Sequence, residues 1–151
     1  FGLVKVNTDL GKKLVHNAGV KNEYESFIND PVIEQQLPFL QFACRDALDK
    51  LSILPVLVGN SSSSAWQRLG EVIGDLAESN KVTVICCASM DNSVATHISA
   101  LDAEDAVQAA QRRQLDHPYV FGALIEIAKH LYCRRGAVLS SDQNKYSMVF
   151  S

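Results

Sequence analysis

The stretch SILPVLVGNSSSSAWQRLGEVIGDLAESNKVTVICC, residues 52–87, decides the fold. Its two ends, residues 52–59 and 82–87, are nearly continuous apolar runs of strand length, a pattern typical of strands that are covered on both faces. Pro55 argues against full pairing of the first run, because proline lacks a backbone donor. Between the runs, residues 65–79 carry apolar side chains at helical spacing, and Ser64 and Gln67 have the spacing of a capping box. The stretch therefore predicts a strand–helix–strand unit.

Two helices are predicted before this unit. The first covers residues 9–17, with Thr8 as its capping residue. The second follows Asp30 and Pro31, a pair that suits a helix start, and continues to about residue 50. Pro38 lies inside this second segment and predicts a kink or a break there.

Two helices and two strands are predicted after the central unit. The helices cover about residues 102–115 and 118–135, and the strands AVLSS and KYSMVFS close the chain. Buried strands thus alternate with amphipathic helices. We expect an α/β fold with a mainly parallel or mixed sheet, helices on both faces, and a single domain over residues 1–151.

Composition narrows the function classes. The 151 residues are 47% hydrophobic and 21% charged, which suits one globular domain rather than a disordered chain. A formal charge of -3 argues against a general nucleic-acid binder, although four arginines could form a local basic patch: Arg112, Arg113, Arg134 and Arg135. No apolar run approaches the roughly 20 residues of a membrane helix, so no membrane association is expected.

The four cysteines form no CxxC pair, so a zinc ribbon has no support. We interpret them as reduced core thiols. This interpretation goes with an expected intracellular location, for which the cytoplasm is favoured and an organelle is the alternative.

The residues at the carboxyl ends of the predicted strands offer few chemical motifs. GxGxxG, GxxxxGK[ST] and GxSxG are all absent from the sequence. Asp91, His97 and His117 have the composition of a two-histidine, one-carboxylate metal site, but their spacing is irregular. The alternative makes Asp91 a turn residue, His97 a surface residue and His117 a helix cap. Glu34 either faces a site or forms a salt bridge, and Asp142 suits a turn.

Six segments resemble, in the same order along the chain, those of the Memo-like protein family. The LPF and PVLVG blocks are the most distinctive parts. The segments are FGLVKVNTDLGKKLV (1–15), DPVIEQQLPFLQ (30–41), SILPVLVG (52–59), VICCASMDNS (84–93), LDHPYVFGALIEIA (115–128) and VLSSDQNKYSMVFS (138–151).

The resemblance implies a class III extradiol dioxygenase-like fold, in which histidines and a carboxylate hold a non-haem iron. It also implies that this chain matches the later part of the family fold, whereas the earlier part supplies further metal histidines. Several reactive positions of the family differ here. The family's motif histidines fall on Pro31 and Ser93, its aspartate falls on Met90 unless the alignment slips to Asp91, and the place of a hairpin cysteine is taken by Gln143.

The retained and altered positions together predict a vestigial pocket. Its expected residues are Glu34, Ser89, Asp91, Ser93, His117, Asp142 and Gln143. A metal site needs nearly its full ligand set, so we expect no cofactor and no catalytic residue. The predicted function is that of a Memo-like scaffold, signalling protein or structural subunit that acts through protein partners. A structural subunit would belong to a larger assembly. The alternative is a non-haem iron or copper redox enzyme completed by residues outside this chain, with His97, His117 or Asp91 as metal ligands of this chain.

Overall fold

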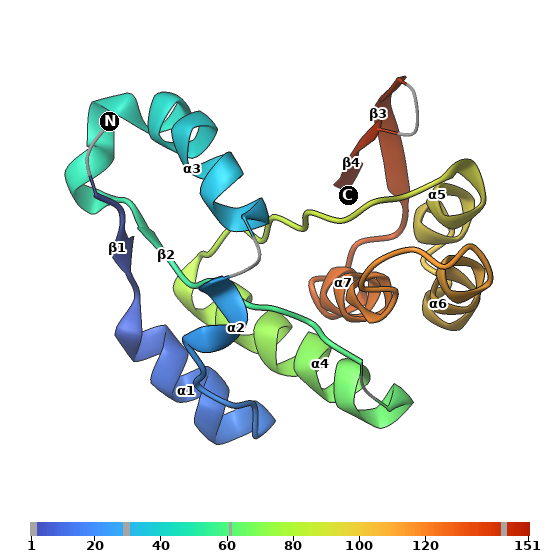
Figure 1. The fold of residues 1–151 in the computed structure, drawn as a ribbon, viewed down its shortest axis with the longest axis horizontal. Coiled ribbons are helices and arrows are strands. Elements are labelled where there is room, and N and C mark those ends of the chain that lie inside the picture. Colours follow the sequence, from blue (N-terminus) through green and yellow to red (C-terminus); the bar gives the residue numbers. More distant parts are fainter. Residues whose placement is uncertain (1–2, 29–30, 61, 143–144) are drawn as a thin grey trace. The chain divides into compact units, whose positions relative to one another are not determined.

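The structure is a computed structural model that describes residues 3–28, 31–60, 62–142 and 145–151. Side chains of residues 140–142 and 145–147 are not described. The chain divides into two compact units, Phe1–Leu57 and Val58–Ser151, called here the N-terminal and C-terminal units. Figure 1 shows helices and short strands in both units.

A two-stranded parallel ladder and several helices build the N-terminal unit. Strand β1 pairs with β2 through Lys5 with Ser52 and Val6 with Ile53. The predicted strand over residues 52–59 is therefore confirmed only in its first two residues, and its remainder has no strand partner within the described ranges. In chain order the elements are β1 (Lys5–Val6), α1 (Thr8–Ala18), α2 (Glu25–Ile28), α3 (Val32–Ala43), the 3-10 helix η1 (Arg45–Lys50) and β2 (Ser52–Ile53).

Local hydrogen bonds fix the helix ends in this unit. The Asn7 side chain caps α1 by accepting from the backbone N–H of Leu10 at 3.1 Å, so Thr8 is the first helical residue and not the cap. Helix α3 continues through Pro38, and the regular helix ends after Ala43 instead. The predicted cap Asp30 lies outside the described residues.

The C-terminal unit is mainly helical. Helix α4 packs on α7, α7 on α6, and α6 on α5 (Figure 1). The strands β3 and β4 form the predicted antiparallel hairpin, with an irregularity between Val138 and Ser140. The elements are α4 (Ser63–Asn80), α5 (Asn92–Ser99), α6 (Ala103–Arg112), α7 (Tyr119–His130), β3 (Gly136–Asp142) and β4 (Lys145–Phe150).

Apolar side chains between these helices form the core of the unit. The largest fully buried side chains are those of Trp66, Val94, Ile98 and Ile125. Helices α4 and α7 approach closely because Gly70 leaves no side chain between them: a Cβ there would lie 2.6 Å from the Cβ of Glu126. Burial of this apolar surface, rather than a sheet, holds the described part of the unit together.

The predicted strand over residues 82–87 is wrong for this structure. Residues 82–90 form an extended trace that leads from α4 to α5 and has no strand partner among the described residues (Figure 1). Its apolar pattern suits a buried strand, but an extended segment becomes one only when a neighbouring strand supplies hydrogen bonds. The predicted layout, a mainly parallel or mixed sheet covered on both faces, is not confirmed. The described residues contain helices and two small two-stranded sheets.

One further helix and two helix ends differ from the sequence-based expectations. The helix α5 was not predicted, although Val94, Ala95 and Ile98 bury one face of it. Helix α4 begins after Ser62, so the proposed capping box at Ser64 is wrong. Helix α7 ends at His130, before a left-handed Tyr132, rather than at Gly136. No helix in the described ranges combines the length and the apolar character needed to cross a bilayer.

Candidate functional site

The predicted pocket residues belong to both units. Glu34 is an exposed residue in the first turn of α3, within the N-terminal unit. Ser89 is exposed on the extended segment of the C-terminal unit, and Asp142 is the last residue of β3. Gln143 lies outside the described residues. The vestigial pocket stays a prediction.

Asp91 has a defined local role at the start of α5. Its Oδ1 accepts hydrogen bonds from the backbone N–H of Val94 at 3.0 Å and from the Ser93 hydroxyl at 2.8 Å. Its Oδ2 lies 3.0 Å from Nε of Arg113. The backbone hydrogen bond from Val94, together with the Ser93 hydroxyl and the Arg113 guanidinium, holds the pKa of the Asp91 carboxyl below its usual range, although burial opposes this shift. Its oxygens are therefore engaged in capping and pairing, as the alternative interpretation of a turn residue predicts.

Replacement of Asp91 by alanine is expected to lower the free energy of unfolding by about 1 kcal/mol at pH 7, because α5 loses its capping acceptor. Because the folded-state pKa is lowered, the charged carboxylate stabilises the fold above its ordinary pKa of 3.8, and this contribution is lost as the pH falls through the lower folded value. Urea unfolding between pH 3 and 7 measures both effects.

The matched control for this prediction is Asp91→Asn. Asparagine keeps a capping oxygen but loses the charge, so it is expected to cost less stability than alanine at pH 7 and to remove the pH-dependent part. Equal losses in the two variants would show that the charge, and not the cap, is what Asp91 supplies.

The two histidine candidates lie in different surroundings. His97 is half-buried in α5. One of its ring nitrogens lies within 4.8 Å of a carboxylate oxygen of Asp102 and of one of Asp105. His117 is exposed, has a left-handed φ of 54°, and lies two residues before α7. His97, Asp102 and Asp105 form a group of potential metal ligands within the described part of the chain. Neither His117 nor Asp91 belongs to this group.

This group does not fit the iron that the family resemblance implies. A facial triad needs two imidazoles and one carboxylate, whereas the group offers one imidazole and two carboxylates. Asp102 is also the cap of α6, where its Oδ1 accepts from the N–H of Asp105 at 3.2 Å. The sequence predicted that Asp102 and Asp105 lie in the first turn of a helix, where carboxylates are favoured by the helix dipole. It missed their closeness to His97, because that depends on the turn between α5 and α6.

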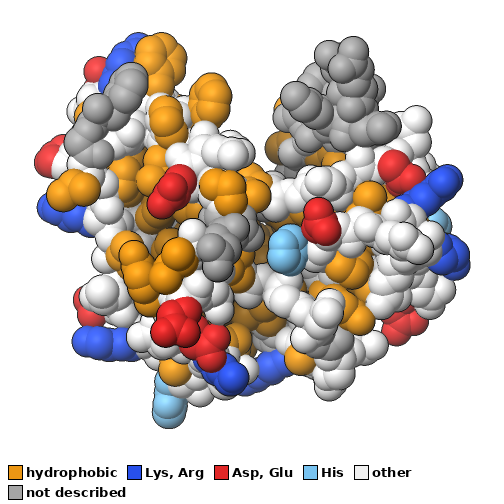
Figure 2. All heavy atoms as spheres, viewed as in Figure 1, with side chains coloured by type: hydrophobic (Ala, Val, Ile, Leu, Met, Phe, Trp, Pro, Cys, Tyr) orange, Lys and Arg blue, Asp and Glu red, His pale blue; other side chains and the backbone are white. Residues whose placement is uncertain are grey.

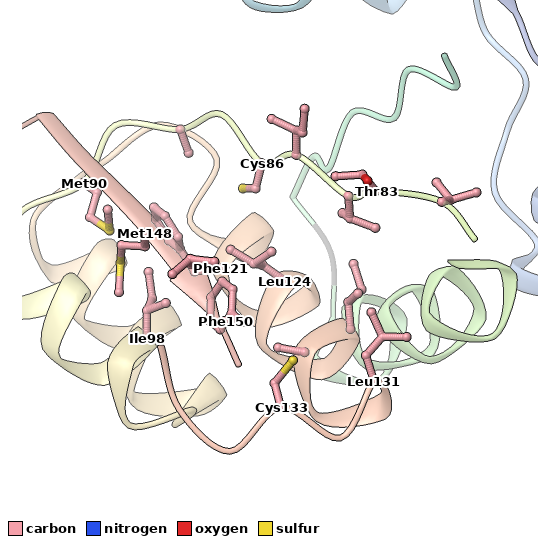
Figure 3. Close-up of a pocket in the computed structure, with 17 residues that line it drawn as sticks. Thr83, Cys86, Met90, Ile98, Phe121, Leu124, Leu131, Cys133, Met148 and Phe150 are labelled. Carbon is pink, nitrogen blue, oxygen red and sulfur yellow. The ribbon is translucent and has the colours of Figure 1, made fainter. Parts of the chain in front are cut away.

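An apolar cavity of about 520 Å³ lies in the C-terminal unit. In Figure 3 the segment that carries Thr83, Cys86 and Met90 follows one side of it, while Phe121 and Leu124 of α7 line the opposite side. Strand β4 contributes Met148 and Phe150, and Ile98, Leu131 and Cys133 complete the labelled lining.

The thiols beside this cavity are poor metal ligands. Burial, with a smaller contribution from Cys87, raises the pKa of Cys86 to about 12, and burial also raises the pKa of Cys87. A metal binds the thiolate form, so neither group is activated for binding at neutral pH. The cysteines are free, and Cys87 is exposed, which corrects its interpretation as a core thiol.

Apolar side chains also reach the surface, as Figure 2 shows on one face of the molecule. In the C-terminal unit, Ile85 is 57% exposed although it belongs to the run that was predicted to be buried. Leu139 and Val149 of the hairpin are exposed as well. Of these three side chains, Ile85 and Val149 also line the apolar cavity, whereas Leu139 does not.

Comparison with known proteins identifies the family. The family model described as Memo-like protein matches residues 1–117, which is more than half of the chain. No curated protein and no solved structure matches the sequence. The match includes the LPF and PVLVG blocks on which the resemblance rests. The chain therefore belongs to the Memo-like protein family.

Proposed function

We propose that this Memo-like chain acts as a scaffold or structural subunit through protein contacts, and that its metal pocket is vestigial. The observation that carries the proposal is the apolar cavity beside residues 82–90, an extended segment that has no strand partner among the described residues. A groove with a row of backbone donors and acceptors along one wall suits an extended polypeptide.

The backbone of the segment supports this occupant. Within the described ranges, the N–H of Val82 bonds to the carbonyl of Ala77 at 3.1 Å, and no backbone bond is found for residues 83–90. An unpaired strand edge is a template for another strand, because its N–H and C=O groups otherwise depend on water. A peptide that pairs with this edge would satisfy them.

The opposite wall of the cavity determines the chemistry of the peptide. Leu124 and Ile127 of α7, together with Leu131 just after it, present apolar side chains to the cavity. Because side chains of a strand alternate between its two faces, we expect a partner segment with apolar residues at every second position. A strand in this place would pair with residues 83–90 and lie beside α7. The sheet-centred layout of the extradiol dioxygenase-like fold that the family suggests is part of the proposal.

The local chemistry of Asp91 supports the vestigial character of the metal pocket. Its oxygens already serve Val94, Ser93 and Arg113, and the guanidinium supplies a positive charge where a metal ion would otherwise be attracted. We also propose an intracellular, cytoplasmic location, which the free thiols support.

A selection from displayed eight-residue peptides tests the protein-contact function. We expect enrichment of sequences with alternating apolar residues, and these peptides should protect the amides of residues 83–88 from hydrogen exchange. Ile85→Lys is expected to weaken their binding at least about tenfold, because a charge on a strand edge opposes pairing. Leu139→Lys, at an exposed site that does not line the cavity, should change binding less than about twofold. Failure to enrich peptides, or enrichment without protection of this segment, would contradict the proposal.

Metal analysis of the purified full-length protein tests the alternative, a non-haem iron or copper redox enzyme. The alternative predicts nearly one iron or copper ion per chain, and it predicts that His117→Ala loses both this metal and dioxygen-dependent catechol cleavage. Such a result would establish the enzyme and overturn the scaffold proposal. Metal well below one ion per chain would agree with the vestigial pocket.

A further inference from the structure

Sulfur-containing side chains gather at the apolar cavity beside residues 82–90. Both methionines of the chain, Met90 and Met148, line it, together with two of the four cysteines, Cys86 and Cys133. The methionines come from different segments, Met90 from the extended segment and Met148 from β4, and Figure 3 shows both side chains in the lining. Neither the family assignment nor the proposed protein contacts explain why every thioether of the chain lies at this cavity.

The remainder of the lining is almost entirely apolar. Among the described residues that line the cavity, Thr83 carries the only hydroxyl group, and none is charged. A thioether fits such a surface, because it is polarisable, uncharged and able to adapt to the shape of an apolar partner. The two methionines therefore contribute to the affinity of the cavity for apolar groups.

A methionine thioether is also a site of oxidation. Met90 and Met148 are half-buried and line the cavity, so hydrogen peroxide has a route to them that a fully buried side chain lacks. One peroxide oxygen bonds to Sδ while the O–O bond breaks, and the sulfur loses two electrons. The second oxygen leaves with both protons as water. The product is a sulfoxide, a polar group in place of an apolar one.

The Cys86 thiol of the lining is protected from the same oxidant. Peroxide reacts with the thiolate form of cysteine, whereas a thioether has no proton to lose before it reacts. Burial, with a smaller contribution from Cys87, raises the pKa of Cys86 to about 12, so its thiol is protonated at neutral pH. The thioethers are therefore the groups that connect this cavity to peroxide chemistry.

A sulfoxide changes what the cavity can bind. Its oxygen accepts hydrogen bonds from water, and an apolar ligand that covers the oxygen removes this water without supplying a donor. A polar group that loses its partners on burial is costly, so a sulfoxide in the lining opposes the binding of apolar ligands.

We propose that Met90 and Met148 form a redox switch of the apolar cavity, in which oxidation of their thioethers by hydrogen peroxide lowers the affinity of the cavity for apolar side chains. The switch rests on the proposed function for its natural ligand, a peptide strand with alternating apolar residues. Reduction of the sulfoxides by methionine sulfoxide reductases reverses it.

Two ligands test the switch on the full chain and separate it from the proposed function. They are the dye 1-anilinonaphthalene-8-sulfonate, which fluoresces in apolar cavities, and an eight-residue peptide enriched by the selection described above. Mass spectrometry of tryptic peptides measures the oxygen atoms that peroxide adds to Met90 and to Met148. We expect both ligands to bind about tenfold more weakly once the sulfoxides are present, with an unchanged helical circular dichroism signal.

The double variant Met90→Leu with Met148→Leu is the matched control, because leucine has nearly the volume of methionine and cannot be oxidised in this way. It should bind both ligands equally before and after peroxide. The two methionine sulfoxide reductases, one for each sulfoxide epimer, should restore binding by the oxidised wild-type chain. Dithiothreitol, which reduces disulfides and sulfenic acids, should not restore it.

Several results would overturn the switch. They are unchanged affinity of the oxidised chain, the same loss of binding in the double variant, recovery with dithiothreitol, and absence of oxidation at both methionines. Loss of the helical signal together with binding would also overturn it, because unfolding would then explain the effect, and so would failure of the untreated chain to bind the dye. Dye binding that peroxide weakens, without any peptide binding, would support the switch and contradict the proposed function.

Discussion

Gly70→Val is expected to lower the free energy of unfolding of the C-terminal unit by about 3 kcal/mol, because the packing of α4 on α7 leaves no space for a side chain. A Cβ at this position would lie 2.6 Å from the Cβ of Glu126 and 2.8 Å from the carbonyl oxygen of Ala123. The carbonyl belongs to the backbone of α7, so relief of the contact requires one helix to move. Helix propensity slightly favours valine over glycine, so the measured loss is somewhat smaller than the packing cost itself.

Urea unfolding followed by Trp66 fluorescence measures this loss, and Gly59→Val is the control. Gly59 belongs to the same unit, is exposed, and a Cβ there would meet no atom within 4 Å. The control should change stability by less than about 0.5 kcal/mol. Similar stability of the two variants would show that α4 and α7 do not approach as closely as the structure has them.

The helices were the part of the fold that sequence reasoning predicted best. The periodicity of residues 65–79 predicted α4, and the helix predicted from about residue 102 agrees with the start of α6 at Ala103. Such signals are local, because a helix satisfies its backbone hydrogen bonds within one segment. The short helix α5 was missed because its polar residues hide the buried face formed by Val94, Ala95 and Ile98.

The sheet was predicted less well, because strands depend on partners that are distant in sequence. Residues 52–59 and 82–87 have similar apolar patterns, yet β2 finds a two-residue partner in β1 and the second run finds none among the described residues. The hairpin of β3 and β4 was predicted correctly, since its strands follow each other closely in the chain. An apolar run thus predicts an extended backbone more securely than it predicts pairing.

In the candidate site, too, local features were predicted better than contacts between residues that are distant in sequence. The sequence indicated a turn at Asp91 but not the helix α5 that Asp91 caps, and its contact with Arg113 joins residues 22 positions apart. The meeting of Met90 and Met148 at one cavity had no sequence signal at all, because the two residues belong to different segments that are distant in the chain. Geometry between elements, rather than the residue types, therefore determines which groups are available for a ligand.

Ile125→Ala is expected to lower the free energy of unfolding by about 3 kcal/mol, because the substitution removes buried methyl groups and leaves a cavity. Ile125 lies on α7 and is 0% exposed. Ile85→Ala makes the same chemical change at a side chain that is 57% exposed, and should cost less than about 0.5 kcal/mol. Urea unfolding of both variants gives the comparison.

This pair separates the two accounts of residues 82–87. Because both substitutions remove the same atoms, the difference between their effects measures burial and not chemistry. A large loss in Ile85→Ala would mean that the run is packed as the buried strand its sequence predicts. A small loss, beside a large loss in Ile125→Ala, would mean that the run is an available edge. In that case the run is free to pair with the peptide strand proposed above.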